Sequence, residues 1–221
     1  MTAALLTLAD SRLPAGGHAH SGGVEQAITA GVVADPATLS TFLRRRLTTA
    51  GAVAAGVAAA ACLAAGGHRE ATLAELDAEA DARTPSPALR AASRQQGRGL
   101  VRVGRRAWPH PAWDALPPQP HHAIALGVAA AAAGLPAWDA AEAAAYLAVS
   151  GPATAAQRLL ALDPITVAAV TARLAPLVDQ VADSAARTAD QGAAALPADA
   201  DPLLDLLAEV HATRKDRFFA S

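Results

Sequence analysis

Apolar side chains recur every three or four residues along most of the chain, and no stretch shows sustained alternation of β-branched and polar residues. This spacing gathers apolar groups on one face of an α-helix, and the abundant alanine has the highest helix propensity of all residues. The pattern therefore predicts an all-α protein. The expected helices cover residues 3–9, 22–32, 37–65, 68–82, 87–107, 121–133, 138–149, 153–162, 164–191 and 201–211.

Proline and glycine positions mark the expected ends of several helices. Asp35 and Asp163 each precede a proline, an order that is typical of a helix start. The sequence Ser150-Gly151-Pro152 predicts a break between two helices, and Pro176 predicts a bend in the long helix that contains it. The proline-rich segment at residues 108–122 predicts a connector without a fold of its own.

The length of the chain bounds the number of domains. A chain of 221 residues can bury a hydrophobic core without disulfides and fits one domain. We therefore expect one helical-bundle domain, of about eight to ten helices, over residues 1–210. Residues 211–221 include RKDRFFAS and show no apolar period, which predicts a flexible C-terminal tail.

Charge and cysteine content narrow the class of protein. The 18 Lys+Arg and 20 Asp+Glu give a net charge of -2, so nucleic-acid binding would need a local cluster of basic residues. Cys62 is the only cysteine, which excludes an intrachain disulfide framework and a multi-cysteine metal site. The N-terminal sequence lacks the basic region of a secretory signal peptide. These features predict a cytoplasmic protein.

One segment has the length of a membrane span. Residues 47–67 carry no charge and follow three consecutive arginines, Arg44, Arg45 and Arg46. Most positions in the segment are alanine or glycine, and no Trp or Tyr marks a membrane interface. Small residues allow close helix packing in water as well as in lipid, so we expect a buried helix of the bundle and no membrane partner.

The opening loop, residues 8–23, reads LADSRLPAGGHAHSGG. Its glycines permit backbone conformations that other residues avoid, and Asp10 and Ser11 can cap neighbouring helix ends. A phosphate-binding loop of the form GxxxxGK[ST] is absent, and Lys215 is the only lysine of the chain. We therefore expect no bound nucleotide, no catalytic residue and no enzymatic activity of its own.

His18 and His20 form an HxH pair in the same loop. Imidazole nitrogens suit Ni(II), Cu(II) or Zn(II), yet two ligands alone make a weak site. The alternative is a loop pair that hydrogen-bonds to backbone or water. We predict no resident metal or cofactor, with His18 and His20 as the candidate contacts for nickel in transit.

Five arginines stand at successive i+4 positions of the helix expected over residues 87–107. Their stripe is either a solvated face or a docking surface for an acidic partner or for phosphates. Gly97 and Gly99 interrupt the same helix, which indicates close approach of another backbone. The five are Arg90, Arg94, Arg98, Arg102 and Arg106.

The tail contains Phe218 and Phe219, two of the three phenylalanines in the chain. Exposed aromatic side chains in a segment without a helical period are typical of a binding site for a partner protein. The alternative is that both rings fold back onto the bundle.

Three stretches together resemble the UreF family of urease accessory proteins: LADSRLPAGGHAHSGGVEQAI near the start, ASRQQGRGL in the middle and AYLAVSGPATAAQRLLAL toward the end, with RFFAS at the C-terminus. The resemblance spans most of the chain. It implies an all-α, dimeric adaptor without enzymatic activity that binds the accessory protein UreD (also called UreH). This adaptor recruits the GTPase UreG, so that nickel reaches the urease apoprotein; GTP is bound by UreG.

The resemblance also implies site residues. The tail residues Arg217, Phe218, Phe219 and Ser221 correspond to the UreD contact. Arg158 and Leu159 correspond to the UreG-facing surface, to which we add Arg94 and Arg98 of the arginine stripe. The family often has an aromatic residue in place of His18, and commonly Pro-Leu-Gly-Gln where this chain has ALDP at residues 161–164. The structural loop that shapes a partner surface comprises Asp10, Ser11, Pro14, Gly16, Gly17, His20 and Ser21.

Two other functions compete with the adaptor. A stand-alone nickel-binding chaperone would use the HxH pair, and a helical nucleic-acid binder would use the arginine stripe. The adaptor is our main prediction, and it includes no nucleic-acid partner.

Overall fold

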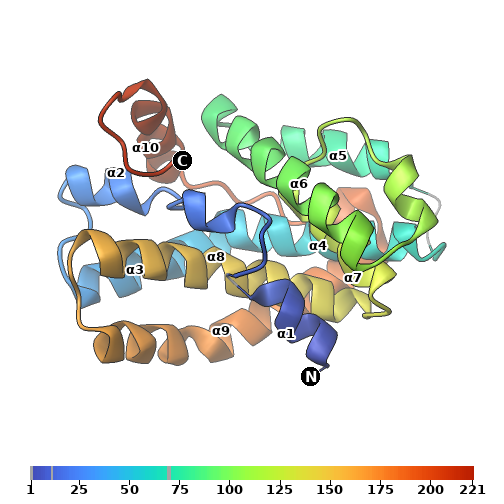
Figure 1. The fold of residues 1–221 in the computed structure, drawn as a ribbon, viewed down its shortest axis with the longest axis horizontal. Coiled ribbons are helices and arrows are strands. Elements are labelled where there is room, and N and C mark those ends of the chain that lie inside the picture. The colour runs from blue at the N-terminus through green and yellow to red at the C-terminus, as the bar shows by residue number, and fades with distance from the viewer. Residues whose placement is uncertain (1, 11, 69–70) are drawn as a thin grey trace.

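The protein folds into helices in a computed structural model that describes residues 2–10, 12–68 and 71–221 (Figure 1). No strand occurs within these ranges, and the prediction of an all-α single domain is confirmed. The helices are α1 (Ala3–Ala9), α2 (Val24–Thr29), α3 (Pro36–Arg46), α4 (Ala52–Ala65), α5 (Leu73–Ala82), α6 (Pro87–Ala107), α7 (His122–Ala132), α8 (Ala137–Leu159), α9 (Pro164–Gln191) and α10 (Pro202–Thr213).

Helix α4 lies at the centre of the bundle and packs against α7, α8 and α9. Its residues 55–62 are all buried, and most of them are alanine. Gly127 of α7 shows how close the helices come, because a Cβ there would overlap the carbonyl oxygen of Ala58 and lie 2.7 Å from the Cβ of Ala61. Small side chains therefore form the core by letting the helix backbones approach one another.

Helices α3 and α4 form one long helical segment that is interrupted by a π-helical turn at Leu47–Gly51. The segment Pro36–Ala65 and helix α9 are both long and apolar enough to cross a membrane by length and composition alone. In the first segment 61% of the most apolar window is buried inside the bundle, and in α9 28% is. A mostly buried core helix passes the same test, so the first segment agrees with the buried helix expected from the sequence.

Helix α8 corrects one sequence prediction, because it runs without a break through Ser150-Gly151-Pro152. A proline within a helix removes the hydrogen bond to the carbonyl oxygen four residues earlier, here that of Ala148. In this fold the Nε of Arg46 donates a hydrogen bond to that oxygen at 3.2 Å. A side chain from α3 therefore replaces the bond that Pro152 cannot make.

The proline-rich connector also differs from the expectation, since it contributes to the core. It contains a 3-10 turn, Pro111–Ala115, in which Trp113 is 1% exposed. The indole Nε1 of Trp113 donates a hydrogen bond to the carbonyl oxygen of Trp108 at 2.8 Å, and Gly104 of α6 leaves the space that the ring fills. Gly97 and Gly99 of α6 lie close to other backbones, as the sequence predicts. A Cβ at Gly97 would overlap the carbonyl oxygen of Pro120, and a Cβ at Gly99 would overlap that of Ala15.

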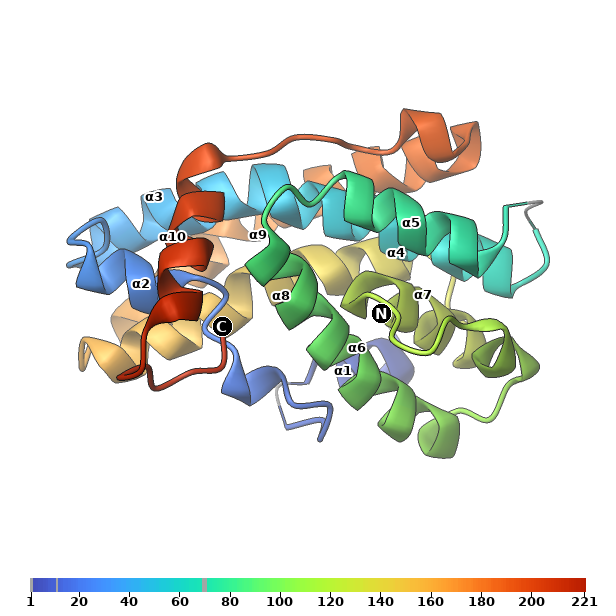
Figure 2. The ribbon, with the colours of Figure 1, turned by 90° about the horizontal axis from the view of Figure 1, so that it is seen from above.

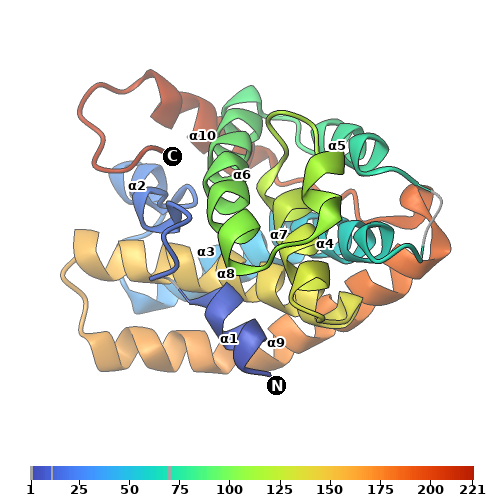
Figure 3. The ribbon, with the colours of Figure 1, turned by 45° about the vertical axis from the view of Figure 1, so that its right-hand side comes forward.

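Helices α2, α6 and α10 lie on one side of the bundle (Figures 1 and 2). An extended segment leads from the end of α9 to α10, and the chain after α10 turns back toward the loop that precedes α2 (Figures 2 and 3). The carboxylate of Asp201 accepts hydrogen bonds from Arg45 at 2.8 Å, and Glu209 accepts them from Ser86 and from the N–H of Ala88. Polar contacts with α3 and with the start of α6 therefore position α10.

Candidate functional site

The first half of the opening loop follows the expected turn chemistry. Asp10 caps the end of α1, and its carboxylate accepts hydrogen bonds from the N–H and guanidinium of Arg12. Gly16 has a φ of 89°, a left-handed conformation that favours glycine, and it precedes the 3-10 turn that Gly17 begins. Pro14 is exposed. Ser11, which the sequence analysis also assigned to this loop, lies outside the described residues.

The second half of the loop binds the end of the chain. The N–H of Ser21 donates to the carbonyl oxygen of Ser221 at 2.5 Å, and the N–H of Ala220 donates to that of Ala19 at 2.7 Å. The Nδ1 of His20 and the Oγ of Ser221 are 2.6 Å apart. Two regions that the sequence analysis singled out separately, the structural loop and the C-terminal tail, therefore form one structure.

Glu25, in the first turn of α2, fixes the backbone of the tail. Its Oε1 accepts a hydrogen bond from the N–H of Phe218 at 2.7 Å, and its Oε2 accepts one from that of Phe219 at 3.0 Å. The Nε2 of His211 in α10 lies 2.9 Å from the same Oε2. The Glu25 side chain is only 4% exposed. Its carboxylate thus joins α2, α10 and the tail.

These contacts correct the expectation of a flexible tail. The backbone donors of residues 218–220 have acceptors in α2 and the opening loop, so the segment is ordered without a helical period of its own. The expected boundary between residues 210 and 211 also falls inside α10, where His211 is buried.

The charge of Glu25 is stabilised in the fold. Burial pushes the pKa of its carboxyl upward, but the hydrogen bonds from His211 and from the two backbone N–H groups outweigh this effect, so the pKa lies below its ordinary value. The carboxylate is therefore ionised at neutral pH and accepts all three bonds.

The two phenylalanines of the tail have opposite environments. Phe219 is 8% exposed and packs against the core, whereas Phe218 is 85% exposed. The guanidinium of Arg158 lies over the Phe219 ring, 5.7 Å from its centroid, which is a cation–π geometry. Arg217 is exposed, and Leu159 is half-buried against the core. The residues expected to face two different partners, Arg158 and Phe219, are therefore neighbours.

The arginine stripe of α6 divides into two parts. Arg94 forms ion pairs with Asp77 at 2.9 Å and with Asp81 at 2.6 Å, and Arg90 approaches Asp81 at 3.9 Å. Arg98 is exposed and donates to the side chain of Gln119. Arg90 and Arg94, the first two arginines of the stripe, thus hold α5 against α6. The guanidinium of Arg94 is therefore already bonded within the chain.

One cluster has the composition of a metal site. Ligand atoms of Asp77, Asp81 and His121 lie within 4.8 Å of one another. The guanidinium of Arg94 bonds to both carboxylates, and the Nε2 of His121 lies 2.8 Å from Asp81. The positive charge that a cation would supply is therefore already provided by Arg94.

The two histidines of the HxH pair have different environments. His18 is exposed, whereas His20 is buried and has its Nδ1 beside Ser221. Burial, and to a smaller extent the nearby His18, lowers the pKa of His20 to about 4. The two imidazoles do not share one environment, and His20 is neutral at pH 7.

The buried His20 predicts acid lability at mildly acidic pH. Its folded-state pKa lies below the unfolded value of about 6.5, so the unfolded chain takes up the proton first and stability falls as the pH drops from about 6.5 toward 4. At pH 5 we expect a cost of about 2 kcal/mol relative to pH 7. Thermal melts between pH 7 and 5 should show a smaller drop in melting temperature for His20→Asn than for the unmodified protein. Equal slopes would contradict this.

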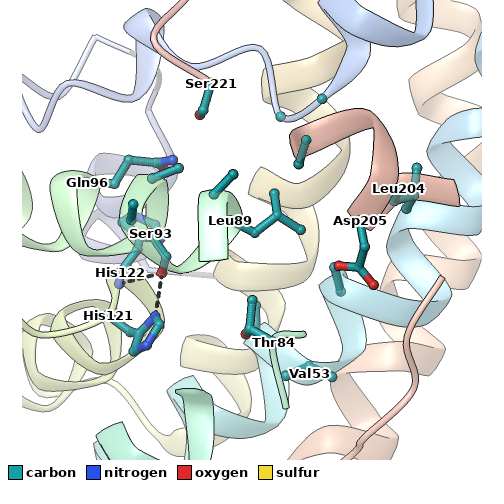
Figure 4. A pocket seen from close by; sticks show the side chains of 18 of the residues that line it. Val53, Thr84, Leu89, Ser93, Gln96, His121, His122, Leu204, Asp205 and Ser221 are labelled. Atoms are coloured by element: carbon teal, nitrogen blue, oxygen red, sulfur yellow. Dashed lines mark hydrogen bonds between the residues drawn. The ribbon is translucent and has the colours of Figure 1, made fainter. Parts of the chain in front are cut away.

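A groove of about 670 Å³ lies between α6 and α10 (Figure 4). Residues of α3 and α4, the start of α7 and the tail also line it. Its lining mixes apolar and charged groups, and those that Figure 4 labels are Val53, Thr84, Leu89, Ser93, Gln96, His121, His122, Leu204, Asp205 and Ser221.

Sequence reasoning did not identify Glu25, His211 and Arg46 as site residues. Glu25 and His211 are 186 positions apart, and each alone reads as an ordinary polar residue of a helix. The available signal was the acidic residue in the first turn of a helix that follows two glycines. That signal identifies a helix start but not the tail that binds there.

Comparison with known proteins gives consistent matches. The UreF family model matches residues 33–175. The urease accessory protein UreF of Mycolicibacterium vanbaalenii is 53% identical over 223 residues, covering 99% of this chain and 98% of that protein. The protein of the same description from Mycobacterium tuberculosis strain H37Rv is 49% identical over 220 residues, again covering 99% and 98%.

Proposed function

Because the chain belongs to the UreF family of urease accessory proteins, which are accessory factors of urease maturation rather than enzymes, we propose that it is the adaptor of a maturation complex. In this proposal it binds a UreD homologue through its tail, recruits the GTPase UreG, and acts as a homodimer in the cytoplasm. The complex delivers nickel to the urease apoprotein, and GTP is bound by UreG.

One observation supports the partner surface most directly. Phe218 is 85% exposed although its own backbone N–H is held by the buried Glu25. A large apolar side chain on a fixed backbone can enter a partner pocket with little loss of conformational entropy, which is the character of an interface anchor. Helix α10 adds two further exposed apolar side chains, Leu206 and Val210.

Co-expression tests the assembly. The chain should co-purify with the UreD homologue, the UreG homologue and the urease apoprotein, and omitting this chain should leave the urease inactive in nickel-containing cells. A urease that matures fully without this chain would contradict the proposal.

A second prediction separates an adaptor from an enzyme. The isolated protein should hydrolyse GTP no faster than buffer, because it has no GxxxxGK[ST] loop and its only lysine is Lys215 in the tail. Phosphate release measured on material free of the UreG homologue checks this. Hydrolysis that survives further purification would show that the chain has an activity of its own.

A further inference from the structure

Five arginines line the groove between α6 and α10, and they fall into two groups. Two have carboxylate partners: Arg83 pairs with Glu79, and Arg94 pairs with two aspartates. For the other three arginines, no carboxylate of the described ranges lies within ion-pair distance. These are Arg46, Arg98 and Arg217.

Arg46 is the most enclosed of the three. It is half-buried at the end of α3, and its Nε donates a hydrogen bond to the carbonyl oxygen of Ala148. A Cβ on Gly22 would lie 3.3 Å from the Cζ of Arg46, so glycine at this position leaves room for the guanidinium. Burial lowers the pKa of Arg46 to about 10, which still leaves it charged at pH 7. Its Nη groups donate to no acceptor among the described residues.

The Nη groups of Arg46 face the groove without a counter-charge, and a guanidinium in this situation can form a bidentate pair with the carboxylate of a ligand. Arg98 of α6 and Arg217 of the tail line the same groove. The acidic lining residues Asp199, Asp201 and Asp205 belong to the start of α10 and the segment before it. The lining therefore carries both signs of charge, with Asp201 already paired to Arg45 outside the groove.

We propose that the groove between α6 and α10 binds an acidic segment of a partner protein, with one carboxylate of that segment paired to the Nη groups of Arg46. An extended polypeptide suits the open groove and its mixed lining, and Arg98 and Arg217 attract further acidic side chains of the same segment. The groove shares Arg217 with the tail that the proposed function uses, whereas Arg46 and Arg98 belong to α3 and α6. It adds a second point of attachment on this chain.

A fluorescein-labelled hexaglutamate peptide is the probe, measured by fluorescence anisotropy on the full chain. The unmodified protein should bind it, and Arg46→Gln should weaken binding at least tenfold while Arg46→Lys retains more of it. The matched control is Arg44→Gln, which changes an exposed arginine of the same helix outside the groove and should alter the affinity less than twofold. Absence of binding, or equal losses for Arg46→Gln and Arg44→Gln, would overturn the proposal.

A second pair of variants tests the groove in case Arg46→Gln does not fold. Arg98→Gln changes an exposed groove residue of α6, and Arg106→Gln changes an exposed arginine of α6 outside the groove. We expect about a threefold loss of peptide affinity for Arg98→Gln and none for Arg106→Gln, as for charges at the rim of a binding site. Equal affinities for these two variants would also overturn the proposal. Neither pair tests the contact made by Phe218.

Discussion

Replacing Glu25 by alanine should lower the melting temperature by about 6 to 12 °C and detach the tail from α2. The variant leaves the Nε2 of His211 and the backbone N–H groups of Phe218 and Phe219 without their acceptor. Each buried donor left unpaired costs about 1 to 3 kcal/mol, so a total of about 3 kcal/mol is a conservative sum. Differential scanning calorimetry measures the first effect, and hydrogen exchange at residues 218 and 219 measures the second.

Glu142 provides a control for the loss of a glutamate as such. It is half-buried, and burial together with Asp139 and Asp179 raises the pKa of its carboxyl, so its charge is disfavoured in the fold. Glu142→Gln should therefore leave the melting temperature unchanged or slightly higher. If Glu25→Ala behaved like Glu142→Gln, and the tail amides remained protected, Glu25 would not be what holds the tail.

Phe219→Ala should also be strongly destabilising. The ring is 8% exposed and lies beneath the guanidinium of Arg158, and truncation of a buried phenylalanine to alanine costs about 3 to 5 kcal/mol. For a chain of this size we expect the melting temperature to fall by about 10 °C. Phe218→Ala, one position earlier, removes a side chain that is 85% exposed and should leave the melting temperature unchanged.

Thermal melts of the two variants in the same buffer decide whether the tail is part of the folded domain. Equal small changes would mean that the tail does not contribute to the core, which is one of the two alternatives that the sequence leaves open. Equal large changes would mean that Phe218 is buried in solution and cannot serve as an exposed anchor.

Helix boundaries that local chemistry determines were predictable from the sequence. The bounds of α1, α6 and α9 agree with the expected ranges because proline, capping residues and apolar spacing act within a few positions. The break expected at Pro152 is absent for a non-local reason. The acceptor that Pro152 frees is bonded by Arg46, which is 102 positions from Ala148 in the sequence.

The candidate site shows the same division between local and distant information. The glycines of the opening loop and the aromatic pair of the tail are visible in the sequence, and both belong to the site. Their contact is not visible, because Glu25 and Phe218 are 193 positions apart. The arginine spacing of α6 is likewise visible in the sequence, but the ion pairs of Arg94 with the aspartates of α5 are not.

We propose that the docked tail presents Phe218 to a UreD homologue. The most direct measurement is the affinity of the purified chain for that homologue, by calorimetry, for the unmodified protein, Phe218→Ala and the control Leu6→Ala. Leu6 is also an exposed apolar residue, 59% accessible, and lies on α1. We predict at least a hundredfold loss for Phe218→Ala, about 2.7 kcal/mol as expected for an aromatic anchor, and less than a twofold change for Leu6→Ala. Undiminished affinity of Phe218→Ala would contradict the claim.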